Sequence, residues 1–130
     1  MRPRILLADD HPAVLKATTA LLEPQFDIVG NATDGAALVS EALRLSPDVI
    51  VIDITMPVLN GIEAAHRLRE ASSFARIVFL TVHSEQQFME ACVAEGALGY
   101  VLKSHMKVHL IPAIRAALIG KSYICPFVSM

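Results

Sequence analysis

The stretch Val49-Ile50-Val51-Ile52-Asp53-Ile54-Thr55-Met56-Pro57, followed closely by Asn60-Gly61, decides the fold of this chain. Four apolar residues run straight into a single carboxylate, and the chain then turns at a proline and a glycine. A short apolar run bounded by turn residues is typical of a strand buried on both faces. Aspartate is rarely buried without a partner, so Asp53 indicates a place where other polar groups converge.

The length and composition favour one soluble domain. The 130 residues suit a single core, and 54% hydrophobic against 18% charged residues favours a backbone covered on two sides. No apolar run reaches the roughly 20 residues of a membrane-spanning helix, and the start 1–4 does not resemble a signal peptide. Cys92 and Cys125 lack metal-ligand spacing, which favours free thiols in a reducing cytoplasm. A formal net charge of −2 gives no sign of a nucleic-acid-binding surface.

Short apolar segments alternate with amphipathic ones along the chain. The predicted strands are 4–8, 27–32, 49–52, 76–81 and 99–102. The predicted helices are 12–22, 34–45, 61–70, 85–95 and a last one that Gly120 closes. Strands joined by helices pair in parallel through right-handed crossovers. We therefore expect a flavodoxin-like, doubly wound α/β fold with a five-stranded parallel sheet of order 2-1-3-4-5 and five helices.

Pro112 does not fit the interior of the last helix. An interior proline removes one backbone hydrogen bond and costs about 3 kcal/mol. The sequence therefore predicts that this helix either begins late, near Ile111, or kinks at the proline.

Chemistry-bearing side chains follow four of the five strands. They are Asp9 and Asp10 after the first strand, Asp53 after the third, Thr81 at the end of the fourth and Lys103 after the fifth. Ligands of doubly wound sheets bind beyond the carboxyl ends of the strands, where the strand order reverses. Three carboxylates, a hydroxyl and an ammonium are thus expected to meet in one cleft.

The charges of these residues restrict the ligands that the cleft can bind. Three crowded carboxylates repel one another, and Lys103 neutralises only one of them. A divalent cation would neutralise the rest, and oxygen-only ligands favour Mg²⁺, with Mn²⁺ as the other candidate, over Zn²⁺. Asp53 could then act as a nucleophile and form an aspartyl phosphate, with the metal, Thr81 and Lys103 stabilising the phosphoryl oxygens.

These residues together resemble the receiver domain of bacterial two-component response regulators. The resemblance covers 4–120 and rests on Asp9-Asp10, Asp53 with Met56-Pro57 and Gly61, Thr81, and Tyr100 ahead of Leu102-Lys103. The stretches 97–103, 113–115 and 123–126 are similar to DNA-binding regulators of the NarL/FixJ class.

The resemblance implies a role for each matching residue. Asp53 would be the phosphoacceptor of a partner histidine kinase, and Thr81 and Lys103 would complete the catalytic set by binding the phosphoryl oxygens. Tyr100 would be the switch aromatic, turning inward when Thr81 moves toward the phosphoryl group. Mg²⁺ would be held by Asp9, Asp10, Asp53 and the backbone carbonyl of Thr55. His11 is expected to be a loop residue and not a metal ligand.

The resemblance also implies a domain organisation. Residues 1–121 would form the receiver domain, and 122–130 would be the start of a linker or a C-terminal tail. The receiver would switch the face built from its fourth helix, fifth strand and fifth helix. It would thereby control a C-terminal helix-turn-helix domain through a homodimer formed on phosphorylation. DNA would be bound only by that absent domain, and no membrane partner is expected.

Other functions remain open at the sequence level. The chain could be a stand-alone receiver that relays a phosphoryl group, and in neither case is it an enzyme acting on an external substrate. A Mg²⁺-dependent phosphatase with an aspartyl-phosphate intermediate usually has an Asp-x-Asp arrangement, which Asp53-Ile54-Thr55 lacks. A nucleotide-binding flavodoxin-like domain needs a glycine-rich turn after the first strand, where this chain has Asp9-Asp10-His11-Pro12.

Overall fold

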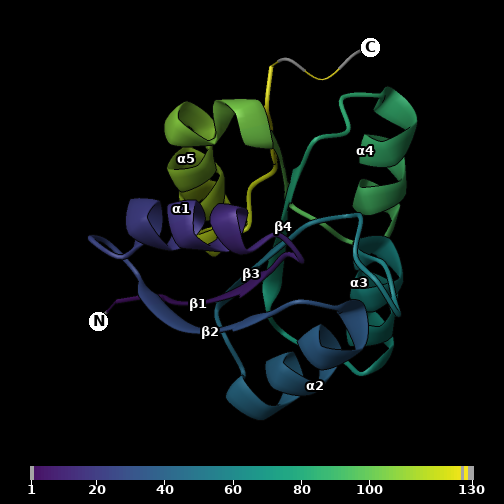
Figure 1. Cartoon of the computed structure of the whole chain (residues 1–130). Coiled ribbons are helices and arrows are strands. Elements are labelled where there is room, and N and C mark those ends of the chain that lie inside the picture. Colours follow the sequence, from purple (N-terminus) through teal and green to yellow (C-terminus); the bar gives the residue numbers. More distant parts are fainter. Residues whose placement is uncertain (1, 127, 129–130) are drawn as a thin grey trace.

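A parallel sheet lies between two layers of helices in the computed structural model, which describes residues 2–126 and 128 (Figure 1). Within these residues the sheet has six strands in the order β2-β1-β3-β4-β5-β6, and every neighbouring pair is parallel. The strands are β1 (Arg4–Ala8), β2 (Asp27–Ala32), β3 (Val49–Ile52), β4 (Arg76–Thr81), β5 (Gly99–Leu102) and β6 (Tyr123–Ile124).

The helices cover both faces of the sheet. They are α1 (Pro12–Leu22), α2 (Gly35–Leu45), α3 (Gly61–Glu70), α4 (Gln86–Ala94) and α5 (Met106–Leu118), and a short 3₁₀ turn (Lys103–His105) precedes α5. Helices α1 and α5 lie on one face, and α2, α3 and α4 lie on the other (Figure 1). None of the helices in the described part of the chain is long and apolar enough to cross a membrane.

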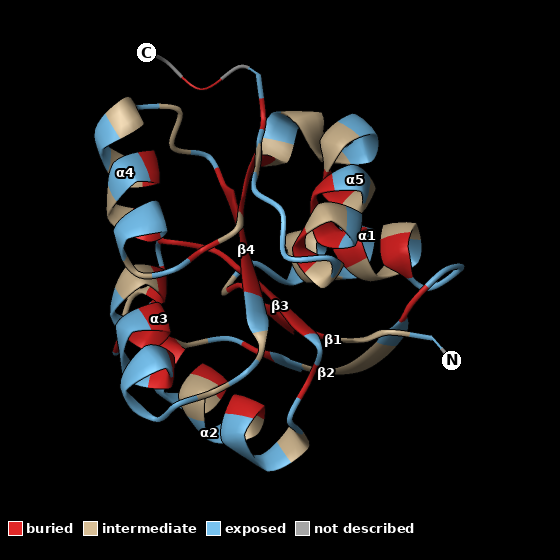
Figure 2. Cartoon of the chain, turned by 180° about the vertical axis from the view of Figure 1, so that it is seen from behind, coloured by how far each residue is buried: buried red, intermediate tan, exposed pale blue. Residues whose placement is uncertain are grey.

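The central strand β3 is buried along its whole length, as its sequence predicts (Figure 2). Ile50 and Ile52 join the core under α2, α3 and α4, whereas Val49 and Val51 join the core under α1 and α5. The alternation of a strand's side chains between the two faces explains this division. Because both faces are covered, an uninterrupted apolar run is what this strand requires.

The predicted strand order is confirmed, but the predicted number of five strands is wrong. Tyr123–Ile124 adds a sixth strand along the free edge of β5. The backbone N–H of Tyr123 donates to the Leu98 carbonyl at 2.8 Å, and that of Cys125 donates to the Tyr100 carbonyl at 2.8 Å. A two-residue strand is too short to show an alternating pattern, and its pairing depends on an edge that only the folded sheet provides.

Of the two alternatives predicted for the last helix, the late start is wrong, and the kink at Pro112 stays a prediction. Helix α5 begins at Met106 and continues through Pro112. Proline has no N–H, so the carbonyl of Val108 lacks its usual donor four residues later. Val108 and Pro112 are both exposed, so water can solvate that carbonyl, and the apolar residues of α5 still pack on the sheet.

The first turn of α3 is fixed directly behind Asp53. The Asn60 side chain accepts from the Glu63 N–H at 2.9 Å, and the Glu63 carboxylate accepts from the Asn60 N–H at 3.1 Å, which forms a capping box. The Gly61 N–H donates to the Ile54 carbonyl at 2.8 Å. A Cβ at Gly61 would lie 2.1 Å from the Asp53 carbonyl oxygen, so only glycine allows this close approach.

We predict that Gly61→Ala destabilises the fold by about 2 kcal/mol or more, because the added methyl group meets backbone that cannot move without displacing Asp53. Gly30→Ala is the matched control, since its Cβ would meet only side-chain ends, those of Leu45 at 3.3 Å and Leu6 at 3.5 Å. Urea unfolding followed by circular dichroism measures both variants. Equal midpoints for the two alanine variants would contradict the proposed close packing at Gly61.

Candidate functional site

Two nearly inaccessible carboxylates lie side by side at the carboxyl ends of β1 and β3. The pairing of Ala8 with Ile52 makes the next residues, Asp9 and Asp53, neighbours. The Asp53 N–H donates to the Ala8 carbonyl at 2.9 Å, and the Asp9 N–H donates to the Ala32 carbonyl at 3.0 Å. Only 4% of Asp9 and 2% of Asp53 is exposed. The sheet therefore holds both charges in place and keeps most water away from them.

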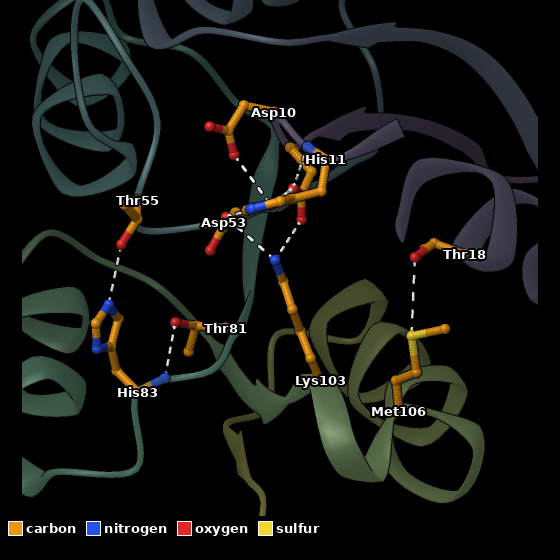
Figure 3. Close-up of polar contacts among 10 residues, drawn as sticks. Asp10, His11, Thr18, Asp53, Thr55, Thr81, His83, Lys103 and Met106 are labelled. Carbon is orange, nitrogen blue, oxygen red and sulfur yellow. Dashed lines mark hydrogen bonds and ion pairs between the residues drawn. The ribbon is translucent and has the colours of Figure 1, made fainter. Parts of the chain in front are cut away.

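Lys103 bridges these carboxylates from the end of β5 (Figure 3). Its Nζ lies 2.8 Å from Asp9 Oδ2 and 3.2 Å from Asp53 Oδ2. Burial by itself lowers the pKa of the ammonium, but the hydrogen bond to Asp9 and the charges of Asp53 and Asp9 outweigh burial and raise it. Lys103 is therefore protonated at neutral pH.

One lysine does not compensate the negative charge around Asp53. Burial raises the pKa of the Asp53 carboxyl, and the nearby charge of Asp9 raises it further. Lys103 and the backbone N–H of Thr55 act in the opposite direction without cancelling the effect. The charged form of Asp53 is therefore energetically unfavourable in this site. Added positive charge would make it more favourable.

His11 reaches into this acidic cluster, which its sequence position did not reveal. It lies in the loop, as expected, at the N-cap of α1. Its Nδ1 is 2.9 Å from Asp9 Oδ1, 3.1 Å from Asp10 Oδ1 and 4.0 Å from Asp53 Oδ2. The sequence places His11 beside the acidic pair but does not give the direction of the turn into α1, which aims the ring inward.

The donor set fits a hard divalent cation. Ligand atoms of Asp9, Asp10, His11 and Asp53 all lie within 4.8 Å of one another. Asp10 Oδ1 is buried and has no hydrogen-bond partner among the described residues, since His11 Nδ1 approaches it without hydrogen-bond geometry. A buried carboxylate oxygen without a donor is an available ligand, and a set dominated by carboxylates suits Mg²⁺ or Mn²⁺.

The remaining predicted residues meet at His83. The fully buried Thr81 hydroxyl accepts from the His83 N–H at 3.1 Å, and the Tyr100 hydroxyl donates to the His83 carbonyl at 2.8 Å. The His83 ring lies 3.0 Å from Thr55 Oγ1, and it stacks on Phe88 of α4 with ring centroids 4.2 Å apart. The sequence offered no direct sign of this junction, because the contacts of His83 with Thr55 and Tyr100 join segments that lie 28 and 17 residues apart.

Tyr100 is turned inward in this arrangement. Only 1% of the residue is exposed, and burial raises the pKa of its phenol. Thr81 meanwhile keeps its hydroxyl on the His83 backbone (Figure 3). The structure thus brings together Asp9, Asp10, Asp53 and Lys103, and it joins Thr81, Thr55 and Tyr100 through His83. The metal-binding role of the Thr55 carbonyl and the movement of Thr81 stay predictions.

Known proteins are similar to this chain in sequence and in fold. The family profile described as the response regulator receiver domain matches residues 5–115. The nitrate/nitrite response regulator protein NarL of Escherichia coli (strain K12) is 35% identical over 119 residues, which cover 90% of this chain and 55% of that protein. The chain thus spans about half the length of this relative.

Solved structures agree with the family match. A two-component response regulator of the LuxR family from Aurantimonas sp. SI85-9A1 has a TM-score of 0.93 and 35% identity, over 98% of this chain and 93% of that chain. A structure of two RcsB dimers bound to two parallel DNAs has a TM-score of 0.89 and 26% identity, over 98% of this chain and 66% of that chain.

We predict that Asp53→Asn stabilises the fold at pH 7, because the folded protein raises the pKa of the Asp53 carboxyl and so disfavours its charged form. The folded-state pKa of Asp53 lies above its ordinary value of 3.8. Its contribution to stability is therefore fully present below pH 3.8 and is lost as the pH rises through the folded-state pKa. The advantage of the asparagine variant should accordingly shrink as the pH falls.

Chemical denaturation at several pH values measures this difference. Glu90→Gln, which removes an exposed carboxylate from α4, is the control and should leave the free energy of unfolding unchanged. An Asp53→Asn variant less stable than the wild type at pH 7 would show that the folded protein does not disfavour the charged form of Asp53.

Proposed function

The chain belongs to the response regulator receiver domain family, and from this membership we propose that it is a phosphorylation-controlled switch with Asp53 as its phosphoacceptor. The family membership confirms the resemblance seen in the strand-end residues, and the match to NarL agrees with the expected class. The observation that carries the proposal is the placement of Asp53, buried at a strand end with its charge only partly compensated.

The proposed chemistry is transfer of a phosphoryl group from a histidine kinase. An Asp53 carboxylate oxygen attacks the phosphorus, the P–N bond to the kinase's phosphohistidine breaks, and the imidazole leaves with the electron pair. Lys103, already 3.2 Å from Asp53 Oδ2, is placed to balance charge on the phosphoryl oxygens. The chain turns over no external substrate, and phosphorylation and dephosphorylation are its own self-catalysed steps.

Asp9, Asp10 and Asp53, together with the backbone carbonyl of Thr55, are proposed to hold Mg²⁺, or alternatively Mn²⁺. The bound ion would supply positive charge to the phosphoryl oxygens. The uncompensated charge at Asp53 and the buried Asp10 oxygen that accepts no hydrogen bond from the described residues support this assignment. His11 would have to release its contacts with Asp9 and Asp10 to leave these oxygens to the ion.

Phosphorylation would be read by Thr81 and Tyr100. The acyl phosphate carries a charge of about −1.5 to −2, where the carboxylate carried −1. The added acceptor oxygens compete for the Thr81 hydroxyl, which now accepts from the His83 N–H. Because the His83 carbonyl holds the Tyr100 hydroxyl and its ring stacks on α4, a shift of Thr81 would alter the α4-β5-α5 face.

We place this switch in a longer transcription regulator. The chain covers 55% of NarL, so a helix-turn-helix domain after residue 130 is the proposed target of the switch. A homodimer formed on phosphorylation would act on that domain, and DNA would be contacted only through it. The related RcsB structure, with dimers bound to DNA, supports this part of the proposal. A cytoplasmic location and a histidine kinase partner complete it.

The proposed function predicts that acetyl phosphate with Mg²⁺ adds one acid-stable, base-labile phosphoryl group, detected by intact mass. Asp53→Asn should abolish the adduct, since the attacking oxygens are changed. Asp10→Asn should slow its formation at least about tenfold, because the site loses a proposed metal ligand. Glu90→Gln should react like the wild type. An adduct that survives Asp53→Asn would refute the assignment.

Mg²⁺ should also stabilise the fold without any phosphodonor. Binding to the folded state alone contributes about 2.7 kcal/mol at a concentration one hundred times the dissociation constant. Thermal unfolding with and without Mg²⁺ measures the shift in Tm, which Asp10→Asn should remove and Glu90→Gln should leave intact. An equal shift in the Asp10→Asn variant would place the cation elsewhere.

A further inference from the structure

The segment after α5 returns to the sheet and lies along the edge of β5. We call its residues Tyr123–Pro126 the strap. Its two hydrogen bonds to the Leu98 and Tyr100 carbonyls set a parallel register in which Ile124 lies opposite Tyr100. In Figures 1 and 2 the strap rises between α4 and α5 toward the C-terminus. The last described part of the chain is therefore bonded directly to the strand that carries the proposed switch aromatic.

Side chains anchor the strap on two sides. Only 1% of Cys125 is exposed, and it belongs to the apolar cluster that also contains Tyr100, Met89 and the buried Val128. The Tyr123 hydroxyl lies 2.7 Å from His109 Nδ1 on α5. The strap thus contacts α5 through Tyr123 and the core beneath α4 through Cys125.

The strap limits where the Tyr100 ring can go. The backbone of Tyr100 lies between Phe79 of β4 and Ile124 of the strap, and its hydroxyl is bonded to the His83 carbonyl. A tyrosine on an uncovered edge strand can swing its ring past the edge into solvent. Here the strap covers that edge, so an outward ring would have to displace it.

We propose that the strap holds Tyr100 inward and thereby couples the chain that leaves the domain to the phosphorylation site. The inference rests on the proposed function, since it uses Tyr100, His83 and Thr81 as the path from Asp53. Strap docking and the inward ring favour each other. By linkage, a phosphoryl group that draws Thr81 toward Asp53 and keeps Tyr100 inward tightens the strap, and a docked strap raises the affinity for that group by the same factor.

The native thiols report on this coupling. Cys125 becomes accessible to N-ethylmaleimide only when the strap opens, whereas Cys92 is fully buried in α4, where burial raises the pKa of its thiol to about 12. Peptide mass spectrometry separates the two labelling rates in the full chain, with Cys92 reporting global unfolding. Beryllium fluoride with Mg²⁺, a phosphoryl mimic, should slow the alkylation of Cys125 at least about fivefold.

A pair of variants tests whether a docked strap raises the affinity for the phosphoryl mimic. Cys125→Asp places a charge at the buried anchor and should release the strap, whereas Ile124→Asp places the same charge at the neighbouring residue, which is 43% exposed. Fluorine NMR of bound beryllofluoride gives the half-saturating concentration. It should rise at least about fivefold in Cys125→Asp and change less than about twofold in Ile124→Asp. Tyr123→Phe, which loses the hydroxyl contact with His109 Nδ1, should give a half-saturating concentration between those of the two aspartate variants.

The possible results distinguish a failure of the proposed function from a failure of the strap coupling alone. Beryllofluoride binding that is absent from the wild type, or that persists in Asp53→Asn, refutes the proposed function and the strap coupling with it. Normal binding in the wild type with no protection of Cys125, and with equal affinities in the two aspartate variants, overturns the strap coupling alone. Should Cys125→Asp fail to fold by circular dichroism, the wild-type labelling and Tyr123→Phe decide the question.

Discussion

Two buried carboxylates share one ammonium, and the rest of the site depends on that shortage of positive charge. Lys103 lies within 3.2 Å of both Asp9 and Asp53, yet the Asp53 pKa is still raised. A site designed only for stability would have matched these charges or removed them. The imbalance favours any ligand that brings positive charge to the site.

Backbone contacts of the fold keep the two carboxylates close together despite their repulsion. The adjacency of β1 and β3 fixes the spacing of Asp9 and Asp53, and the absence of a side chain at Gly61 lets α3 close directly behind Asp53. Beyond the carboxylates, His83 joins Thr81, Tyr100 and α4 by contacts from its backbone and its ring. These contacts are the route by which the proposed movement of Thr81 would reach the far edge of the sheet.

The sequence was informative wherever one local pattern decided the outcome. The apolar run of β3 and its terminal carboxylate predicted a buried central strand, and the alternation of strands with helices predicted the order of the first five strands. The strand-end positions of Asp9, Asp53 and Lys103 predicted their convergence. Prediction from the sequence failed where the outcome depends on how distant segments pack together. The strap needs the edge of β5, the inward direction of His11 needs the turn into α1, and the start of α5 at Met106 needs packing that outweighs the missing bond at Pro112.

We propose that Asp53, and no other carboxylate of the cluster, carries the phosphoryl group. Asp9 is almost as buried and also contacts Lys103, so burial alone does not distinguish the two. Borohydride reduction of the phosphorylated chain converts an aspartyl phosphate into homoserine, and peptide sequencing by mass spectrometry then locates the modified residue. We expect homoserine at position 53 alone. Homoserine at position 9 or 10, or none in a chain that carries a base-labile phosphoryl group, would contradict it.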